Sequence, residues 1–134
     1  MSDTAANRAM VQLLELPQPP TAVFAASDNM AVGALRALHD RGLRVPDDVA
    51  VIGYDDLPLA AFTSPPLTSV HQPISDMGAH AVRVLIEQIR GQSPATSVRL
   101  PARLVVRDSC GGGAALLRAK GGSDLARGAP TLAN

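Results

Sequence analysis

The sequence has few of the residues from which metal, disulfide and nucleic-acid sites are built. It contains one cysteine, Cys110, three histidines, no tryptophan and 2% aromatic residues. A single cysteine cannot close an internal disulfide, and scattered histidines do not form a metal site. The 12 basic and 12 acidic residues cancel, so the net charge gives no reason to bind DNA phosphates. We therefore expect no metal, no disulfide and no stand-alone nucleic-acid binder.

Long apolar runs and catalytic motifs are missing as well. No apolar stretch approaches the ~18 residues that cross a bilayer, and residues 1–4 do not begin a secretory signal. The chain has no Gly-x-Gly-x-x-Gly loop, Walker loop or Gly-x-Ser-x-Gly elbow. We therefore expect a cytoplasmic protein without membrane contact, which is not an enzyme and needs no cofactor.

The 46% of apolar residues is arranged in alternating helical and strand patterns. Spacings of three and four predict helices over residues 4–15, 28–41 and 75–90, the last capped by Ser75. Short apolar runs predict strands over residues 21–26, 49–53, 67–71 and within 98–107. These elements predict one folded domain over residues 1–110. Residues 111–134 are rich in glycine and alanine and predict a flexible tail.

The run Val49–Gly53 is apolar at nearly every position, as in strands that are covered on both faces of a parallel sheet. With the preceding helix and strand it predicts a strand–helix–strand unit. The predicted fold class is α/β, an open parallel sheet with flanking helices. Ligands of such sheets bind beyond the carboxyl ends of the strands.

Two polar clusters follow predicted strands at that edge: Ser27-Asp28-Asn29 and Tyr54-Asp55-Asp56. Their carboxylates could accept hydrogen bonds from the hydroxyl groups of a sugar or nucleoside. Ser27 or Asp28 could instead cap the following helix, and Asp56 could begin a turn. His71 and His80 lack a partner at catalytic spacing, and we interpret them as solvated or packing residues.

Four ordered blocks carry a resemblance to a known family: PTAVFAASDNMAVGAL at 20–35, GLRVPDDVAVIGYDD at 42–56, PPLTSV at 65–70 and LPxxLVVR at 100–107. They resemble the LacI/GalR family of bacterial transcriptional regulators. The resemblance implies a periplasmic-binding-protein-like (type I) sensor domain, in which two α/β subdomains enclose a small effector, usually a sugar or purine. In that family, DNA is bound by an N-terminal helix-turn-helix, which these residues do not contain.

The resemblance also implies roles for particular residues. Effector contacts fall on Ser27 and Asp55, with Asp28 and Tyr54 adjacent, and on Ile74. The family commonly has Asn where this chain has Ser27, and some members carry an aromatic residue where it has Ile74. The homodimer interface implied by the family falls on Val32, Leu59, Phe62 and Thr63.

Compared with the family pattern, the chain covers only the last part of a regulator, which we interpret as a truncated product or a partial gene model. We expect it alone neither to bind operator DNA nor to hold a sugar tightly. In the family pattern, the helix over residues 75–90 packs on an N-terminal subdomain. Here it would expose Met77, Leu85 and Ile89.

Two other functions stay open at this point. The first is a sugar-binding solute-binding protein of a transport system, which shares the fold but would need a secretory signal. The second is a phosphoryl-accepting receiver domain that uses Asp55, Asp56 and Mg²⁺. Resemblance to receivers would require a lysine that contacts the phosphoryl group, and the predicted folded part has none.

Overall fold

The computed structural model describes residues 3–92 and 97–112. This part contains three α-helices, α1 (Asp3–Leu14), α2 (Asp28–Asp40) and α3 (Ile74–Ile89), and four strands, β1 (Ala22–Phe24), β2 (Ala50–Asp55), β3 (Thr68–His71) and β4 (Arg103–Val105). Short 3₁₀ helices follow β2 and β4, namely η1 (Pro58–Ala61) and η2 (Asp108–Cys110). The predicted helices and strands all occur, within a few residues of their expected ends. Of the predicted flexible tail, residues 113–134 lie outside the described part.

The strands form one sheet in the order β1-β2-β3-β4. β1 pairs with β2, and β2 with β3, in parallel. The α/β class and the open sheet are confirmed, but the expectation of an entirely parallel sheet is wrong at β4, which is antiparallel to β3. Arg103, the first residue of β4, lies opposite His71, the last residue of β3. The chain therefore returns to the sheet at the end of β3 that precedes α3. For this reason β4 runs antiparallel to β3.

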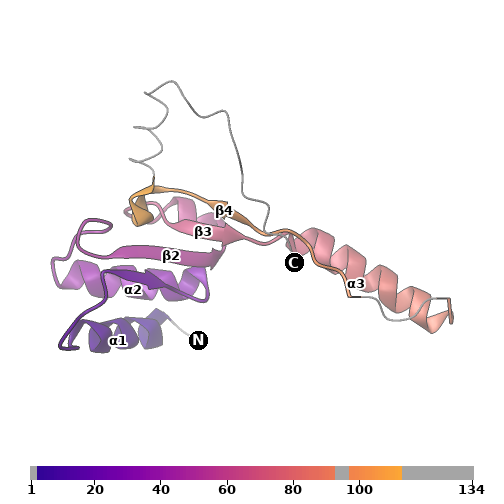
Figure 1. The fold of residues 1–134 in the computed structure, drawn as a ribbon, viewed down its shortest axis with the longest axis horizontal. Helices are drawn as coiled ribbons and strands as arrows, with labels where there is room; N and C mark the ends of the chain where they lie inside the picture. The colour runs from indigo at the N-terminus through magenta and orange to yellow at the C-terminus, as the bar shows by residue number, and fades with distance from the viewer. Residues whose placement is uncertain (1–2, 93–96, 113–134) are drawn as a thin grey trace, which may run out of the picture.

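The core lies between the sheet and α2. Figure 1 shows α1 and α2 running side by side, with α2 nearer to β2 than α1, and Met10 of α1 belongs to the same core as the residues of α2 and the strands. Small residues on α2 allow this close approach. The buried core residues are Met10, Ala25, Ala31, Ala34, Leu35, Ala37, Leu38, Val49, Val51, Ala60 and Leu67.

Local chemistry sets the ends of α2. Ser27 has an extended backbone, and its side chain accepts a hydrogen bond from the Met30 N–H, so Ser27 rather than Asp28 is the N-cap. After the C-cap, Arg41, the chain turns at Gly42 with φ +68°, a conformation that glycine adopts without a steric penalty.

The helix α3 begins one residue earlier than its sequence pattern predicts. The expected cap at Ser75 is wrong, because Pro73 is the N-cap and provides no side-chain hydrogen bond. Its carbonyl accepts the first helical bond from the Met77 N–H, and its ring fixes φ near the helical value. The proline therefore starts the helix where the hydroxyl of Ser75 was expected to do so.

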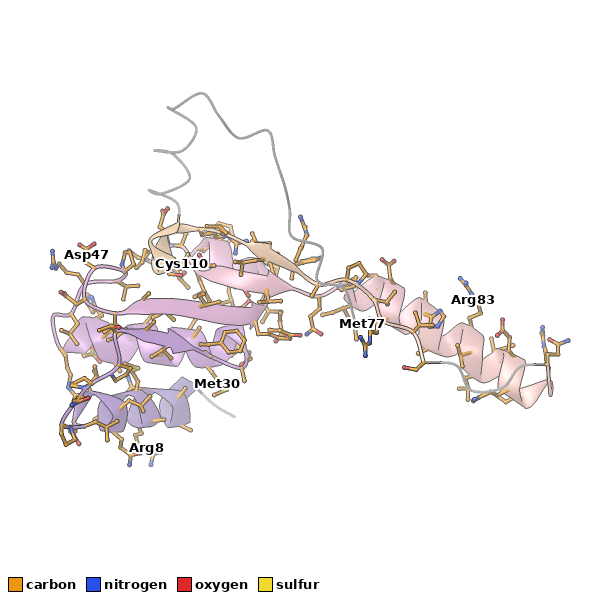
Figure 2. All side chains as sticks on the ribbon, in the orientation of Figure 1. Arg8, Met30, Asp47, Met77, Arg83 and Cys110 are labelled. Atoms are coloured by element: carbon orange, nitrogen blue, oxygen red, sulfur yellow. The ribbon has the colours of Figure 1, made fainter. Side chains whose placement is uncertain are left out.

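No residue of α3 is buried. Figure 1 shows α3 extending away from the sheet, and Figure 2 shows its Met77 and Arg83 far from the α1–α2 layer. The expected exposure is confirmed: Met77 is 44% exposed, Leu85 56% and Ile89 78%. Even so, no helix among residues 3–92 and 97–112 combines the length and apolar character that crossing a membrane requires.

Candidate functional site

The carboxyl ends of β1, β2 and β3 meet at one edge of the sheet, because these strands are parallel and neighbouring. Ser27 follows β1, Asp55 ends β2, and Ile74 comes shortly after β3. The predicted adjacency of the two polar clusters is therefore confirmed by the register. We call this margin the carboxyl edge.

An open pocket of about 340 Å³ lies at the carboxyl edge. It is lined by Asp55, Asp56, Leu57, Pro58, His71, Gln72, Pro73, Ile74, Ser75 and Asp76. Asp55 and Ile74, two of the expected ligand contacts, thus come together in one hollow. The pocket joins carboxylates to apolar surface, the combination that orients a small polar molecule while covering its carbon face.

A sharp backbone turn places Asp55 at this pocket. Asp55 has φ +102° and Asp56 has φ +53°, both in the left-handed region that side chains other than glycine rarely enter. The Gln72 side-chain amide donates to Asp55 Oδ1 at 2.7 Å. Gln72 therefore orients the carboxylate that is expected to receive a ligand hydroxyl.

The other expected contacts, Ser27, Asp28 and Tyr54, are not among the residues that line the pocket. Ser27 accepts the capping hydrogen bond with its oxygen, and a serine hydroxyl can still donate its proton to a ligand. Tyr54 packs edge-on against Phe24, with ring centroids 6.2 Å apart. Asp28 is fully buried and bonds to Leu57 and Ser69 inside the protein.

Asp56 is held by two side chains that the sequence patterns did not single out for this site. Arg107 donates to Asp56 Oδ1 at 2.7 Å, and His71 Nδ1 lies 3.0 Å from Asp56 Oδ2. His71, which was interpreted as a solvated or packing residue, is partly exposed and has Asp56 as an acidic partner. Arg107 follows β4, which is antiparallel to β3. Its ion pair with Asp56 could therefore be predicted only if the direction of β4 were known. Gln72 and His71 could have been found from their place at the end of a parallel strand.

The residues expected at the dimer interface gather on one flank of the molecule. Val32 of α2 and Thr63 line a groove of about 320 Å³ together with Leu35, Arg36, His39 and Ser64. Leu59 lies in η1, and Phe62, just beyond it, is 86% exposed. We call Val32, Leu59, Phe62 and Thr63 the α2–η1 surface.

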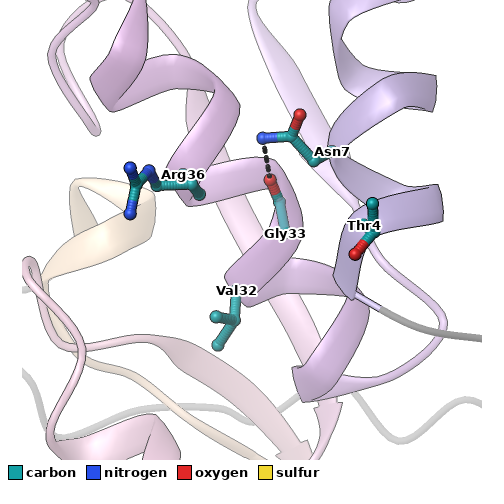
Figure 3. A pocket seen from close by; sticks show the side chains of 5 residues that line it. All are labelled: Thr4, Asn7, Val32, Gly33 and Arg36. Carbon is teal, nitrogen blue, oxygen red and sulfur yellow. Dashed lines mark hydrogen bonds between the residues drawn. The ribbon is translucent and has the colours of Figure 1, made fainter.

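A second hollow, of about 400 Å³, adjoins the α2–η1 surface between α1 and α2. Figure 3 shows Thr4 and Asn7 of α1 facing Val32, Gly33 and Arg36 of α2. The Asn7 amide donates to the Gly33 carbonyl at 3.3 Å and ties the two helices together. Val32 and Arg36 line both hollows, so one hollow lies on each side of these two residues of α2.

Comparisons with known proteins show what this chain and its fold are similar to. Residues 1–110 match the model of the periplasmic binding protein-like domain. The HTH-type transcriptional repressor CytR of Escherichia coli (strain K12) is 46% identical over 106 residues, which are 78% of this chain. A solved complex of the transcriptional regulator CelR with cellobiose is 43% identical, with a TM-score of 0.76 over 81% of this chain and 34% of that one.

A third similar structure is the lac repressor dimer bound to operator and the anti-inducer ONPF. It is 36% identical, and its TM-score is 0.76 over 81% of this chain and 38% of that one. The 134 residues span about a third of each of these proteins: the matched part of CytR is 31% of its length. The relatives are transcriptional repressors and regulators, which are not enzymes. Across the described residues, no group of three or more His, Cys, Asp and Glu side chains is placed to hold a metal ion.

Proposed function

Because the chain belongs to the periplasmic binding protein-like domain family, and within it to the LacI/GalR regulators, we propose that it forms the effector-sensing and dimerising part of a transcriptional regulator. Its role is binding and not catalysis, and it acts in the cytoplasm, where transcription takes place. Contact with DNA falls to a helix-turn-helix, which is not part of these residues. The similarity to repressors favours this function over sugar transport.

We further propose that the carboxyl edge forms one wall of the effector pocket. The observation that carries this proposal is the meeting of Asp55 and Ile74 in one open pocket, at the edge of the sheet where Ser27 follows β1. The Asp55 carboxylate would accept from ligand hydroxyls, the Ser27 hydroxyl would donate, and Ile74 would cover an apolar face. A neutral sugar or nucleoside offers this combination of groups.

The short Ser27 hydroxyl and the aliphatic Ile74 side chain bear on which effector is bound. A hydroxyl reaches less far than an amide and offers a single donor. An aliphatic chain supports a sugar ring by burial alone, without the stacking of an aromatic ring. We therefore propose a compact polyol as the effector, bound by this wall alone in the millimolar range.

Nuclear magnetic resonance titration of the 134-residue chain with ribose, cellobiose and cytidine tests this proposal. We expect one of them to shift the amide signals of residues 27, 55 and 74 as a group. Asp55→Asn should weaken that response several-fold, whereas Asp76→Asn, a change to another carboxylate of the same pocket, should have a smaller effect. Submicromolar affinity, or shifts confined to other surfaces, would contradict the proposal of a single pocket wall.

We also propose that the α2–η1 surface forms a homodimer. The lac repressor structure is a dimer, and the groove beside Val32 and Thr63 can receive an exposed aromatic side chain. Phe62 is such a side chain and lies next to that groove in sequence. In a twofold dimer each copy offers both features, so Phe62 of each copy can fill the groove of the other.

A further inference from the structure

Asp28 is fully buried although it carries a carboxylate. Its Oδ2 accepts from the Leu57 backbone N–H at 2.7 Å, and its Oδ1 accepts from the Ser69 hydroxyl at 2.6 Å. The Ser69 oxygen in turn accepts from the Asp56 backbone N–H at 3.0 Å. These contacts join the first residue of α2 to β3 and to the turn that ends β2. We call Asp28, Ser69 and the two backbone N–H groups the Asp28 clamp.

The Asp28 clamp holds the chain immediately after Asp55. Asp55 and Asp56 have φ angles of +102° and +53°, and such angles in residues other than glycine persist only where the surroundings hold them. The N–H groups of residues 56 and 57 are the backbone donors directly beyond this turn. Two bonds to a buried hydroxyl and a buried carboxylate fix both peptide planes, and so fix the direction in which Asp55 leaves the sheet.

Gly53 provides a second observation, independent of the hydrogen bonds. A Cβ atom at Gly53 would overlap Asp28 Oδ1 and lie 2.9 Å from Leu67 Cδ2. The strand thus leaves space for the carboxylate two residues before Asp55. Gly53 has no positive φ, so the space and not the backbone conformation accounts for glycine at this position.

We propose that Asp28 is a positioning residue for effector binding, which sets the orientation of Asp55 without touching the effector itself. This inference rests on the proposed function of the carboxyl edge. Asp28 follows the N-cap Ser27 and does not line the pocket. It acts on the pocket through its hydrogen bonds to the turn that carries Asp55. Loss of the clamp frees the turn at residues 55–57, and Asp55 then no longer keeps its bond to Gln72.

The test compares two fully buried serines, Ser69 of β3 and Ser109 of η2. Ser69→Ala removes the central hydroxyl of the Asp28 clamp. Ser109→Ala is the matched control, because Ser109 is also fully buried and its hydroxyl links Val51 and Thr68 away from the carboxyl edge. Asp28→Asn, which keeps the shape and one acceptor oxygen, serves as the second clamp variant.

Two readouts are recorded on the full 134-residue chain. The first is the Gln72 side-chain amide signal, which reports the position of Asp55 without any ligand. The second is the dissociation constant for ribose, measured by resonance titration. In Ser69→Ala and Asp28→Asn we expect the Gln72 signal to move towards that of a free amide and ribose to bind about fivefold more weakly or worse. Ser109→Ala should lower stability but leave both readouts near wild type.

The two readouts separate the inference from the proposed function. If ribose fails to bind the wild-type chain while the Gln72 signal responds only to the clamp variants, the positioning of Asp55 stands and ribose is not the effector. If folded Ser69→Ala and Asp28→Asn leave the Gln72 signal unchanged, the inference is overturned. It is equally overturned if Ser109→Ala moves the signal by the same amount.

Discussion

At the scale of single residues, the sequence identifies candidate polar side chains but not their hydrogen-bond partners. Ser27 and Asp55 could be placed at one edge because each follows a short apolar run of the strand type. The burial of Asp28 could not be predicted, because its partner Ser69 lies 41 residues away and on β3. Whether a carboxylate faces solvent or the interior depends on which strand becomes the neighbour of which, and local patterns do not contain that information.

We expect Gly53→Ala to lower the free energy of unfolding, although the change adds only one methyl group. The added methyl group overlaps Asp28 Oδ1 and crowds Leu67, and overpacking of this kind destabilises by about 1–3 kcal/mol. Urea unfolding followed by circular dichroism measures the change. Gly78→Ala on α3, where nothing lies within 4 Å of the new Cβ, is the matched control and should be neutral or slightly stabilising. Equal stability of the Gly53 variant and the wild type would show that the carboxylate can move aside.

At the scale of elements, apolar periodicity predicts where the helices and strands lie along the chain. It does not predict the direction in which a strand runs in the sheet. The strand at residues 103–105 was expected, but its antiparallel direction follows from the path of the chain out along α3 and back. That direction also brings Arg107 to Asp56. The start of α3 was misplaced by one residue because a proline can begin a helix without a capping side chain.

The next prediction concerns self-association through the α2–η1 surface, which two elements form together. Phe62→Ser should weaken self-association at least about tenfold, because exposed aromatic side chains that enter a groove contribute most to interfaces. Sedimentation equilibrium over a range of concentrations measures the dissociation constant. Leu16→Ser is the control, since Leu16 is also an exposed apolar residue, 49% accessible, but follows α1 outside this surface. A Phe62 variant that associates as strongly as the Leu16 variant would argue for another interface.

At the scale of the whole molecule, the described residues form one body of α1, α2 and the sheet with a shared core, and one helix, α3, extends away from it (Figure 1). The sequence predicted the α/β class and the broad apolar face of α3. Amphipathicity alone could not show what covers that face, because an apolar stripe requires burial without specifying the partner. The resemblance to LacI/GalR regulators implies one partner for that face, an N-terminal subdomain, and this stays a prediction.

The apolar face of α3 should therefore make the 134-residue chain associate beyond a dimer. Exposed apolar side chains at Leu85, Ile86 and Ile89 lie together at one end of the helix, and contiguous patches of this kind promote association. Leu85→Gln combined with Ile89→Gln should reduce the higher oligomers seen by light scattering, while the affinity of the dimer stays the same. Arg83→Gln with Glu87→Gln changes the same helix without removing apolar surface and should leave association unchanged. If the apolar pair has no effect, the association arises elsewhere. The next surface to alter is then β1, an edge strand among the described strands, because an edge strand can pair with that of another copy.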